Sequence, residues 1–326
     1  MYIETGRAPQ SYVSTHPTAG GESPASALAG RRVRVSPTAT KGLETSRRKE
    51  YFLSDPKAET DSPEQDYSGA SRLDGQAALI TGAGSERDIG REIGLAYAAA
   101  GASVGLADMD EGGVRAAARA VQAAGGAATP LYMDATDPGS VSAAVAAFGR
   151  EVGAVDILVN SADISRSTPI WEIGLEEFDL IMGINVRGGF LCLKAVLPAM
   201  MRQRRGRIVW LSSVAGKQGG GVLGSSHYAT SKAAVIGLCQ AAARELGPYG
   251  ITSNAIAPGF VDTGVVARSS SQEVEDQVRV SVAGSTPLRR VATVKDIACA
   301  ALYLASDAAA YVTGEILDVN GGSYFD

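Results

Sequence analysis

A tyrosine and a lysine four residues apart, Tyr228 and Lys232, are the side chains whose types and spacing best suit proton transfer. Residues 228–238 read Tyr-Ala-Thr-Ser-Lys-Ala-Ala-Val-Ile-Gly-Leu, which predicts a helix with both side chains on one face. A free phenol has a pKa near ~10, and a neighbouring ammonium lowers that pKa by favouring the phenolate. The pair is therefore a candidate proton donor and acceptor, although the same spacing also occurs on ordinary helix surfaces.

A glycine-rich turn over residues 81–90 is a second candidate site. It follows an apolar run and precedes a helix-like stretch, where glycines let the backbone approach a pyrophosphate and the helix N-terminus favours negative charge. A tight turn without a ligand is the alternative. The position of the turn after the first core strand favours dinucleotide binding.

Two carboxylates end the next two predicted strands. Asp108 lies 26 residues after Gly82, where a carboxylate can accept hydrogen bonds from the adenosine ribose and would repel a 2′-phosphate. This position favours NAD over NADP, while Arg87 in the turn is a competing signal for a phosphate. Asp134 can contact the adenine edge. The alternatives are a helix cap for Asp108 and a turn for Asp134.

The elements that must position these residues alternate between strand and helix from Leu73 onward. Strands are predicted at 77–81, 102–107, 128–133, 156–160, 207–211, 251–256 and 315–319. Helices are predicted at 91–100, 111–124, 138–152, 176–202 and from Tyr228 to Leu246, with Gly247 and Pro248 as C-cap and breaker. This order predicts an α/β fold, a doubly wound, Rossmann-type parallel sheet with right-handed crossovers.

Residues 1–72 differ from the rest of the chain. They are rich in Ser, Thr, Pro, Gly and charge and show no strand or helix periodicity, so they cannot bury enough surface to offset their ordering entropy. We expect a disordered, dispensable extension there, followed by one domain over residues 73–326. Glu4, Glu22 and Glu44 argue against a transit peptide, and the segment has no apolar core of a secretory signal.

Composition argues against several classes of function. The net charge of −5 disfavours binding to nucleic acid or to an anionic membrane surface. Because no apolar run reaches ~18 residues, no spanning helix is expected. Cys192, Cys239 and Cys299 lack metal or disulfide spacing and only two histidines are present, so no metal site is expected. We expect buried free thiols and a cytoplasmic protein.

Several motifs, in order, make residues 73–326 resemble the short-chain dehydrogenase/reductase family. The matching stretches are the glycine turn, Asp-Ile-Leu-Val-Asn-Ser-Ala at 156–162, Ile-Asn-Val around Asn185, Ser-Ser-Val-Ala-Gly around Ser213, the Tyr228–Lys232 pair, Pro-Gly-Phe-Val-Asp-Thr at 258–263, and the C-terminal stretches 290–293 and 311–322. Together, in this order and spacing, they are more specific than any one alone.

The resemblance implies an NAD-dependent oxidoreductase that interconverts a secondary alcohol and a ketone. Tyr228 would exchange a proton with the substrate oxygen, and Lys232 would hold the nicotinamide ribose. Ser213 would donate a hydrogen bond to the substrate oxygen, and Asn185 would kink its helix and hold a water. The implied cofactor contacts are Gly82, Ser85, Ile89, Gly90, Asp108, Asp134, Ala135, Asn160, Tyr228, Lys232, Val261 and Thr263. The family also implies a homotetramer built on the two long helices and the C-terminal strand.

The chain departs from the family pattern at three places. Asp88 stands where the middle glycine of a shorter turn would be, and it either adds charge near a pyrophosphate or caps the helix. Asp163 replaces the glycine that ends the fourth-strand motif, and it either tunes or damages the site. Ser213 and Tyr228 are 15 residues apart, two more than is common, and the glycine-rich segment 219–225 can absorb the difference.

The substrate is the least determined part of the sequence interpretation. The stretch from Gly264 to Ser285, expected to face it, is polar, which favours a sugar, polyol or other small hydroxy compound. A 3-oxoacyl-carrier-protein reductase is the near alternative, opposed by Asp108 and the lack of a basic docking patch. A nucleotide-binding protein that lost turnover is the third, suggested by Asp88 and Asp163.

Overall fold

The computed structural model describes residues 69–325, except Arg87, 221–224 and 264–271. Within these residues a seven-stranded sheet has the order β3-β2-β1-β4-β5-β6-β7, and all neighbouring strands are parallel. The strands are β1 (Ala77–Thr81), β2 (Ser103–Asp108), β3 (Ala127–Tyr132), β4 (Ile157–Asn160), β5 (Gly206–Leu211), β6 (Ile251–Pro258) and β7 (Ile316–Val319). The predicted doubly wound α/β fold is confirmed. The predicted extension lies outside the described residues except for 69–72.

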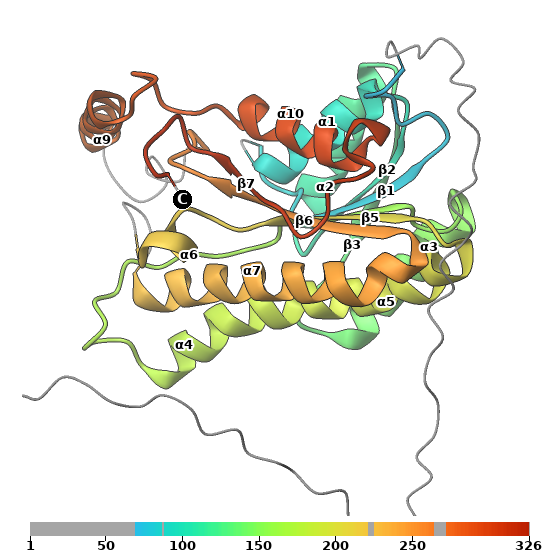
Figure 1. Cartoon of the computed structure of the whole chain (residues 1–326), viewed down its shortest axis with the longest axis horizontal. Coiled ribbons are helices and arrows are strands. Elements are labelled where there is room, and N and C mark those ends of the chain that lie inside the picture. Colours follow the sequence, from blue (N-terminus) through green and yellow to red (C-terminus); the bar gives the residue numbers. More distant parts are fainter. Residues whose placement is uncertain (1–68, 87, 221–224, 264–271, 326) are drawn as a thin grey trace, which may run out of the picture. The chain divides into compact units, whose positions relative to one another are not determined.

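Helices cover both faces of the sheet (Figure 1). One face carries α1 (Ile89–Ala99), α2 (Glu111–Ala123) and α10 (Val294–Ala305). The other carries α3 (Pro138–Glu151), α4 (Leu175–Met182), α5 (Gly189–Gln203) and α7 (Ser226–Leu246). Two more helices, α6 (Ala215–Gln218) and α9 (Gln272–Ser285), follow β5 and β6. Because helices cover both faces, β1 and β4 are buried along their whole length, as continuously apolar strands should be.

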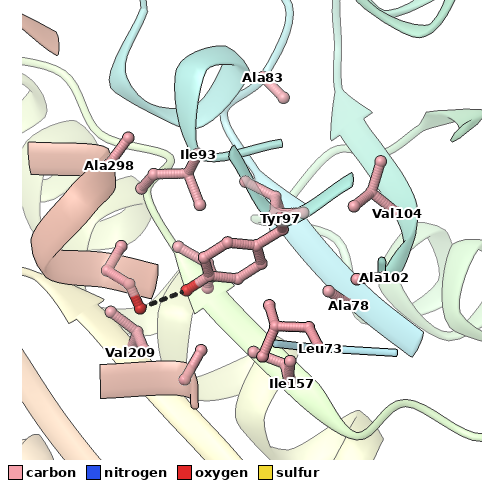
Figure 2. Packing of buried hydrophobic residues seen from close by; sticks show 14 of the residues in the cluster. Leu73, Ala78, Ala83, Ile93, Tyr97, Ala102, Val104, Ile157, Val209 and Ala298 are labelled. Carbon is pink, nitrogen blue, oxygen red and sulfur yellow. Dashed lines mark hydrogen bonds between the residues drawn. The ribbon is translucent and has the colours of Figure 1, made fainter. Parts of the chain in front are cut away.

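The core on the α1 side is organised around Tyr97, shown in Figure 2 with Ile93 and Ala298. Tyr97 is fully buried, and its hydroxyl donates a 2.8 Å hydrogen bond to the carbonyl of Ala301 on α10. This bond offsets the cost of burying a hydroxyl, while burial raises the pKa of the phenol. Tyr97 therefore ties α1, which follows the glycine turn, to α10.

The strand order reverses direction between β1 and β4. The chain runs outward from β1 through β2 to β3, then returns to place β4 on the other side of β1. In doubly wound sheets a crevice opens at this point, outside the carboxyl ends of the strands. The glycine turn after β1 and the loop after β4 both lie there.

The long helix predicted over 176–202 consists of three segments. A π-helical turn, η1 (Gly183–Gly188), separates α4 from α5, and Asn185 lies inside it. Single π-helical turns inside α-helices are frequent at functional sites. The distortion lies where the family resemblance places a kink.

The C-terminal half agrees with the sequence prediction in part. α7 ends at Leu246 with Gly247 as its C-cap, as predicted. Gly247 has a right-handed conformation, with φ of −49°, and opens the 3₁₀ turn η2 (Gly247–Tyr249); the left-handed glycine is Gly250, with φ of 70°. Pro248 explains this, because its fixed φ suits the first turn of a helix. The stretch from Gly264 to Ser285, expected to face the substrate, contains the helix α9; neither α9 nor α10 was predicted.

The thiols and the apolar helix also differ in part from expectation. Cys192 and Cys239 are buried, which raises their pKa values to about 12 and about 11, but Cys299 is exposed on α10. Among the described residues, one helical run, Leu175–Gln203, is by length and composition apolar enough to cross a membrane, which was not expected. A core helix passes the same test, and this run packs against α3 and α7.

Candidate active site

Two adjoining cavities open at the carboxyl edge of the sheet, of about 180 Å³ and about 170 Å³. Both are lined by Asp88, Ser161 and Asp163, so they form one continuous cleft. The first, here the catalytic cavity, is also lined by Ile89, Ser165, Ser213, Tyr228, Phe260, Val261 and Thr263. The second, here the turn cavity, is also lined by Gly82, Asp108, Met109, Asp134, Ala135 and Thr136.

Tyr228 and Lys232 lie together on α7, as their spacing predicts. The Lys232 Nζ is 5.5 Å from the centre of the Tyr228 ring. The Ser213 hydroxyl, two residues after β5, lines the same cavity as the Tyr228 phenol and accepts a hydrogen bond from the Ala215 amide at 3.1 Å. The Tyr228 phenol and the Ser213 hydroxyl therefore both line the catalytic cavity, and the Lys232 ammonium lies beside the Tyr228 ring without lining that cavity.

The pKa of Tyr228 is set by opposing influences. Burial raises this pKa most, and Asp163 raises it further, while Lys232 and Ser213 lower it; the net direction is upward. Lys232 therefore acts in the predicted direction. Burial of the phenol outweighs its charge in the cofactor-free protein.

Lys232 is almost fully buried and held from two sides. Its Nζ donates a 2.8 Å hydrogen bond to the carbonyl of Leu211 and forms an ion pair with Asp163. Burial alone would lower the pKa of Lys232, but Asp163 and Tyr228 outweigh burial and raise it. The ammonium thus has a fixed place beside Asp163 and the Tyr228 ring.

Asn185 ties three elements together. Its Oδ1 accepts from the Ile164 amide, and its Nδ2 donates to the Ile164 carbonyl, both at 2.9 Å. The Nδ2 also donates to the Ser231 hydroxyl at 3.0 Å. The side chain therefore connects the π-helical turn, the loop after β4 and α7. Its predicted water is not tested by these contacts.

The glycine turn is packed too closely for side chains at two positions. Gly82 has φ of 68°, and a Cβ there would lie 2.6 Å from the Cα of Ala162. A Cβ on Gly90 would lie 2.4 Å from the Gly82 carbonyl oxygen. Thr81 joins the turn to the loop after β4, because its hydroxyl accepts hydrogen bonds from the Ser161 and Ala162 amides. These contacts bring the bare backbone of the turn to the cleft.

Three carboxylates around the turn cavity are held by backbone amides. Asp108 accepts from the Gly84 amide at 3.1 Å and from the Asp110 amide at 3.0 Å. Asp134 accepts from the Thr136 amide and hydroxyl, which is the turn given as its alternative. Asp88 accepts from the Ile89 amide at 2.9 Å and caps α1, so the capping alternative describes its position.

The remaining predicted cofactor residues differ in where they lie. Val261 and Thr263 line the catalytic cavity and Ala135 the turn cavity, whereas Ser85, Gly90 and Asn160 line neither. Asn160 is buried at the end of β4 and lines a separate small cavity with Asn185 and Lys232, and neither polar atom of its side chain has a hydrogen-bond partner among the described residues. The glycine turn, where a Cβ on Gly82 or Gly90 would clash, fits the close approach of a dinucleotide.

Sequence reasoning missed a buried histidine beside Tyr228. His227 lies within 2.8 Å of Glu177 through Nε2 and of Ser225 through Nδ1. These contacts pin the start of α7 to α4. Hydrogen bonds from Thr168 and His227 lower the pKa of Glu177. A lone histidine directly before the tyrosine was the available signal. The described part of the chain contains no group of three or more His, Cys, Asp or Glu residues suited to a metal.

Known proteins resemble this chain over most of its length. A family model described as enoyl-(acyl carrier protein) reductase matches residues 82–324. The 3-oxoacyl-(acyl-carrier-protein) reductase FabG of Escherichia coli strain K12 is 39% identical over 252 residues, covering 77% of this chain and 98% of that protein. The short-chain reductase protein NovJ of Streptomyces niveus is 38% identical, covering 75% of this chain and 92% of that protein.

Two solved structures share the architecture. A short-chain type dehydrogenase/reductase from Mycobacterium marinum has a TM-score of 0.73 at 34% identity, covering 79% of this chain and 98% of the other. The protein gox2181 has a TM-score of 0.74 at 32% identity, covering 79% of this chain and 99% of the other. The similarity spans nearly the whole of each relative, so it includes the sheet, the turn and the helix that carries Tyr228.

Proposed function

This chain belongs to the short-chain dehydrogenase/reductase family, and from that premise we propose that it interconverts a secondary alcohol and a ketone with NAD, using Tyr228 to move the proton. It is an oxidoreductase acting on CH–OH donors. The observation that carries the proposal is that Tyr228 and Ser213 line one cavity, with the Lys232 ammonium 5.5 Å from the Tyr228 ring centre, near a glycine turn whose close packing suits a dinucleotide.

The proton chemistry belongs to three side chains. In reduction the Tyr228 phenol donates its proton to the substrate oxygen, and in oxidation the phenolate accepts it. Ser213 donates a hydrogen bond to the same oxygen and stabilises the negative charge that develops there. The bound nicotinamide supplies or accepts the hydride. Lys232, held by the Leu211 carbonyl and Asp163, presents a cation to the phenolate and to the cofactor ribose.

We propose NAD in preference to NADP because of Asp108. Its carboxylate lies at the rim of the turn cavity, where it can accept hydrogen bonds from ribose hydroxyls. A 2′-phosphate there would meet this charge, and Asp134 adds another on the same wall. The other predicted cofactor residues keep their proposed roles: Gly82, Ser85, Ile89, Gly90, Ala135, Asn160, Val261 and Thr263.

For the substrate we propose a 3-oxoacyl thioester, reduced at its 3-oxo group. The name of the Escherichia coli relative supports this class over the sugar or polyol that the polar stretch before Ser285 favours. Part of that stretch, 264–271, lies outside the described residues. Because the two interpretations differ in substrate alone, one screen separates them.

The proposed working form is a cytoplasmic homo-oligomer, a tetramer by family resemblance. Its support is the apolar surface left on the long helices, where Phe178, Leu180 and Phe190 are exposed. We propose that residues 73–326 form the whole catalytic domain and that 1–72 are not required for activity.

The test is a cofactor screen followed at 340 nm, with acetoacetyl-CoA and 3-hydroxybutyryl-CoA in one arm and polyols, sugars and simple secondary alcohols in the other. Turnover in the thioester arm supports the proposed substrate, and turnover confined to the second arm supports the polyol alternative. NADH binding without turnover in either arm would favour the nucleotide-binding alternative.

A further inference from the structure

Asp163 occupies an unusual place in the cleft. It follows β4 in the sequence Asn-Ser-Ala-Asp, lines both cavities, and forms an ion pair with Lys232. The Lys232 side chain is 2% exposed, and that of Asp163 is 36% exposed. A buried cation at the reaction site therefore has a carboxylate partner that also faces the cleft.

The backbone at Asp163 is not strained, so the replacement of glycine by Asp does not distort the loop after β4. The non-glycine residues with positive φ in the described chain are Arg204 and Arg289. Asp163 therefore adopts an ordinary conformation, although the family resemblance places glycine there. The backbone of this chain does not require glycine at position 163, so a side chain with a chemical role can occupy it.

We propose that Asp163 is a positioning residue that acts through Lys232: its carboxylate holds the ammonium in place and balances the charge on which the Tyr228 phenolate depends. The inference deepens the proposed function and rests on it. In the absence of Asp163 the full positive charge of Lys232 would act on the phenol.

The other elements packed around Tyr228 offer few competing charges. Asp88, at the start of α1, lines the same cavity but caps its own helix. Glu177 on α4 reaches α7 through His227. Lys217 on α6 is paired with Asp318 on β7. The groups that β5 and the π-helical turn contribute are neutral: the Leu211 carbonyl and the Asn185 side-chain amide.

The direction of the effect follows from these charges. Burial is the largest influence on the pKa of Tyr228, and it does not change in an isosteric variant. Asp163 raises this pKa and Lys232 lowers it. Asp163→Asn removes the negative charge and keeps the shape. The Leu211 carbonyl still holds the Lys232 ammonium near Tyr228, so the phenolate becomes easier to form.

The first experiment needs no turnover. The absorbance of tyrosinate at 295 nm is titrated in the cofactor-free full chain, and the Tyr228 signal is the difference between each protein and its Tyr228→Phe counterpart. We expect the midpoint in Asp163→Asn to lie about one pH unit below wild type, the size that a single nearby charge produces. Asp163→Glu restores the charge and should return the midpoint toward wild type.

Glu151→Gln is the matched control, because Glu151 is an exposed carboxylate at the end of α3 and its loss changes the net charge equally. An unchanged Tyr228 midpoint in Asp163→Asn, or an equal change in Glu151→Gln, would overturn the proposal. If Asp163→Asn does not fold, Asp163→Ser is titrated under the same criteria.

The second experiment uses turnover. The acid limb of kcat/KM for alcohol oxidation should move to lower pH by a similar amount in Asp163→Asn, and return in Asp163→Glu. If Asp163 had a purely structural role, Asp163→Asn would lower kcat/KM without moving the acid limb of its pH profile. That result would contradict the proposal. If wild type turns over no substrate, the proposed function fails, while the absorbance titration still decides the role of Asp163.

Discussion

The surroundings of one phenol decide how this site works. Burial keeps the pKa of Tyr228 above its ordinary value in the cofactor-free protein, even with Lys232 beside it. The protonated form, which donates to a ketone, is therefore the resting state at neutral pH. At neutral pH the site therefore favours reduction of a ketone, whereas oxidation of an alcohol requires the Tyr228 phenolate.

We predict opposite pH dependences for the two directions. Because the pKa of Tyr228 is raised, the oxidation rate should increase with pH beyond 8, while the reduction rate should hold at neutral pH and fall only in the alkaline range. Initial rates in both directions from pH 6 to 10 measure this. An oxidation rate that already levels off below pH 7 would contradict the prediction.

Asp108 should decide the choice of cofactor. We predict that NAD gives the higher kcat/KM, and that Asp108→Asn reduces the NAD-to-NADP ratio by about 10-fold, the effect of about 1.4 kcal/mol of lost repulsion and ribose binding. Asp137→Asn is the control, since Asp137 caps α3 and lines neither cavity. A higher kcat/KM with NADP in wild type would refute the assignment.

At the level of elements, α10 depends on its N-terminus. Thr293 and Asp296 form a capping box, and Arg290 holds the Asp296 carboxylate through both oxygens at 2.7 Å. The Arg290 hydrogen bonds are the main cause of the lowered pKa of Asp296. Since α10 is joined to α1 by Tyr97, a weakened cap should reduce the stability of the domain.

We predict that Thr293→Ala lowers the free energy of unfolding by about 1 kcal/mol. Asp296→Asn should cost about 1 kcal/mol or less at pH 7, since the pair is partly exposed to solvent. A carboxyl group whose pKa is lower in the folded protein than in the unfolded chain stabilises the fold at pH values above its unfolded pKa, ~4. The cost of Asp296→Asn should therefore shrink as the pH falls below ~4. Urea unfolding at pH 7 and pH 3.5 measures both effects. A cost that persists at the lower pH would contradict the charge argument.

The elements differ in how far the sequence could predict them. The strands and the turn were predictable because apolar runs and glycines act locally, and Gly82 and Gly90 are required by contacts within the turn. The pairing of Asp163 with Lys232 was not predictable, because it depends on how the loop after β4 lies over α7. The helix α10 was missed although Thr293 and Asp296 have capping-box spacing, which a search for that signal would have found.

On the scale of the whole molecule, the long helices leave apolar side chains on the surface. Leu180 on α4 is 47% exposed and Phe190 on α5 is 45% exposed. We predict that Phe190→Glu lowers the molar mass measured by light scattering, because a charge cannot be buried unpaired between subunits. Arg119→Glu, on the exposed side of α2, is the control on the opposite face. Equal masses for wild type and Phe190→Glu would refute an interface on this helix.

The most direct test of the proposed function compares wild type with Tyr228→Phe, which removes one hydroxyl from the catalytic cavity. With any substrate that the screen identifies, we predict that kcat falls by about 10²-fold or more, the usual contribution of a positioned acid or base. The melting temperature should stay close to wild type, and NADH should still bind. Turnover by Tyr228→Phe at the wild-type rate, with the same substrate and cofactor, would contradict the assignment of Tyr228 as the group that moves the proton.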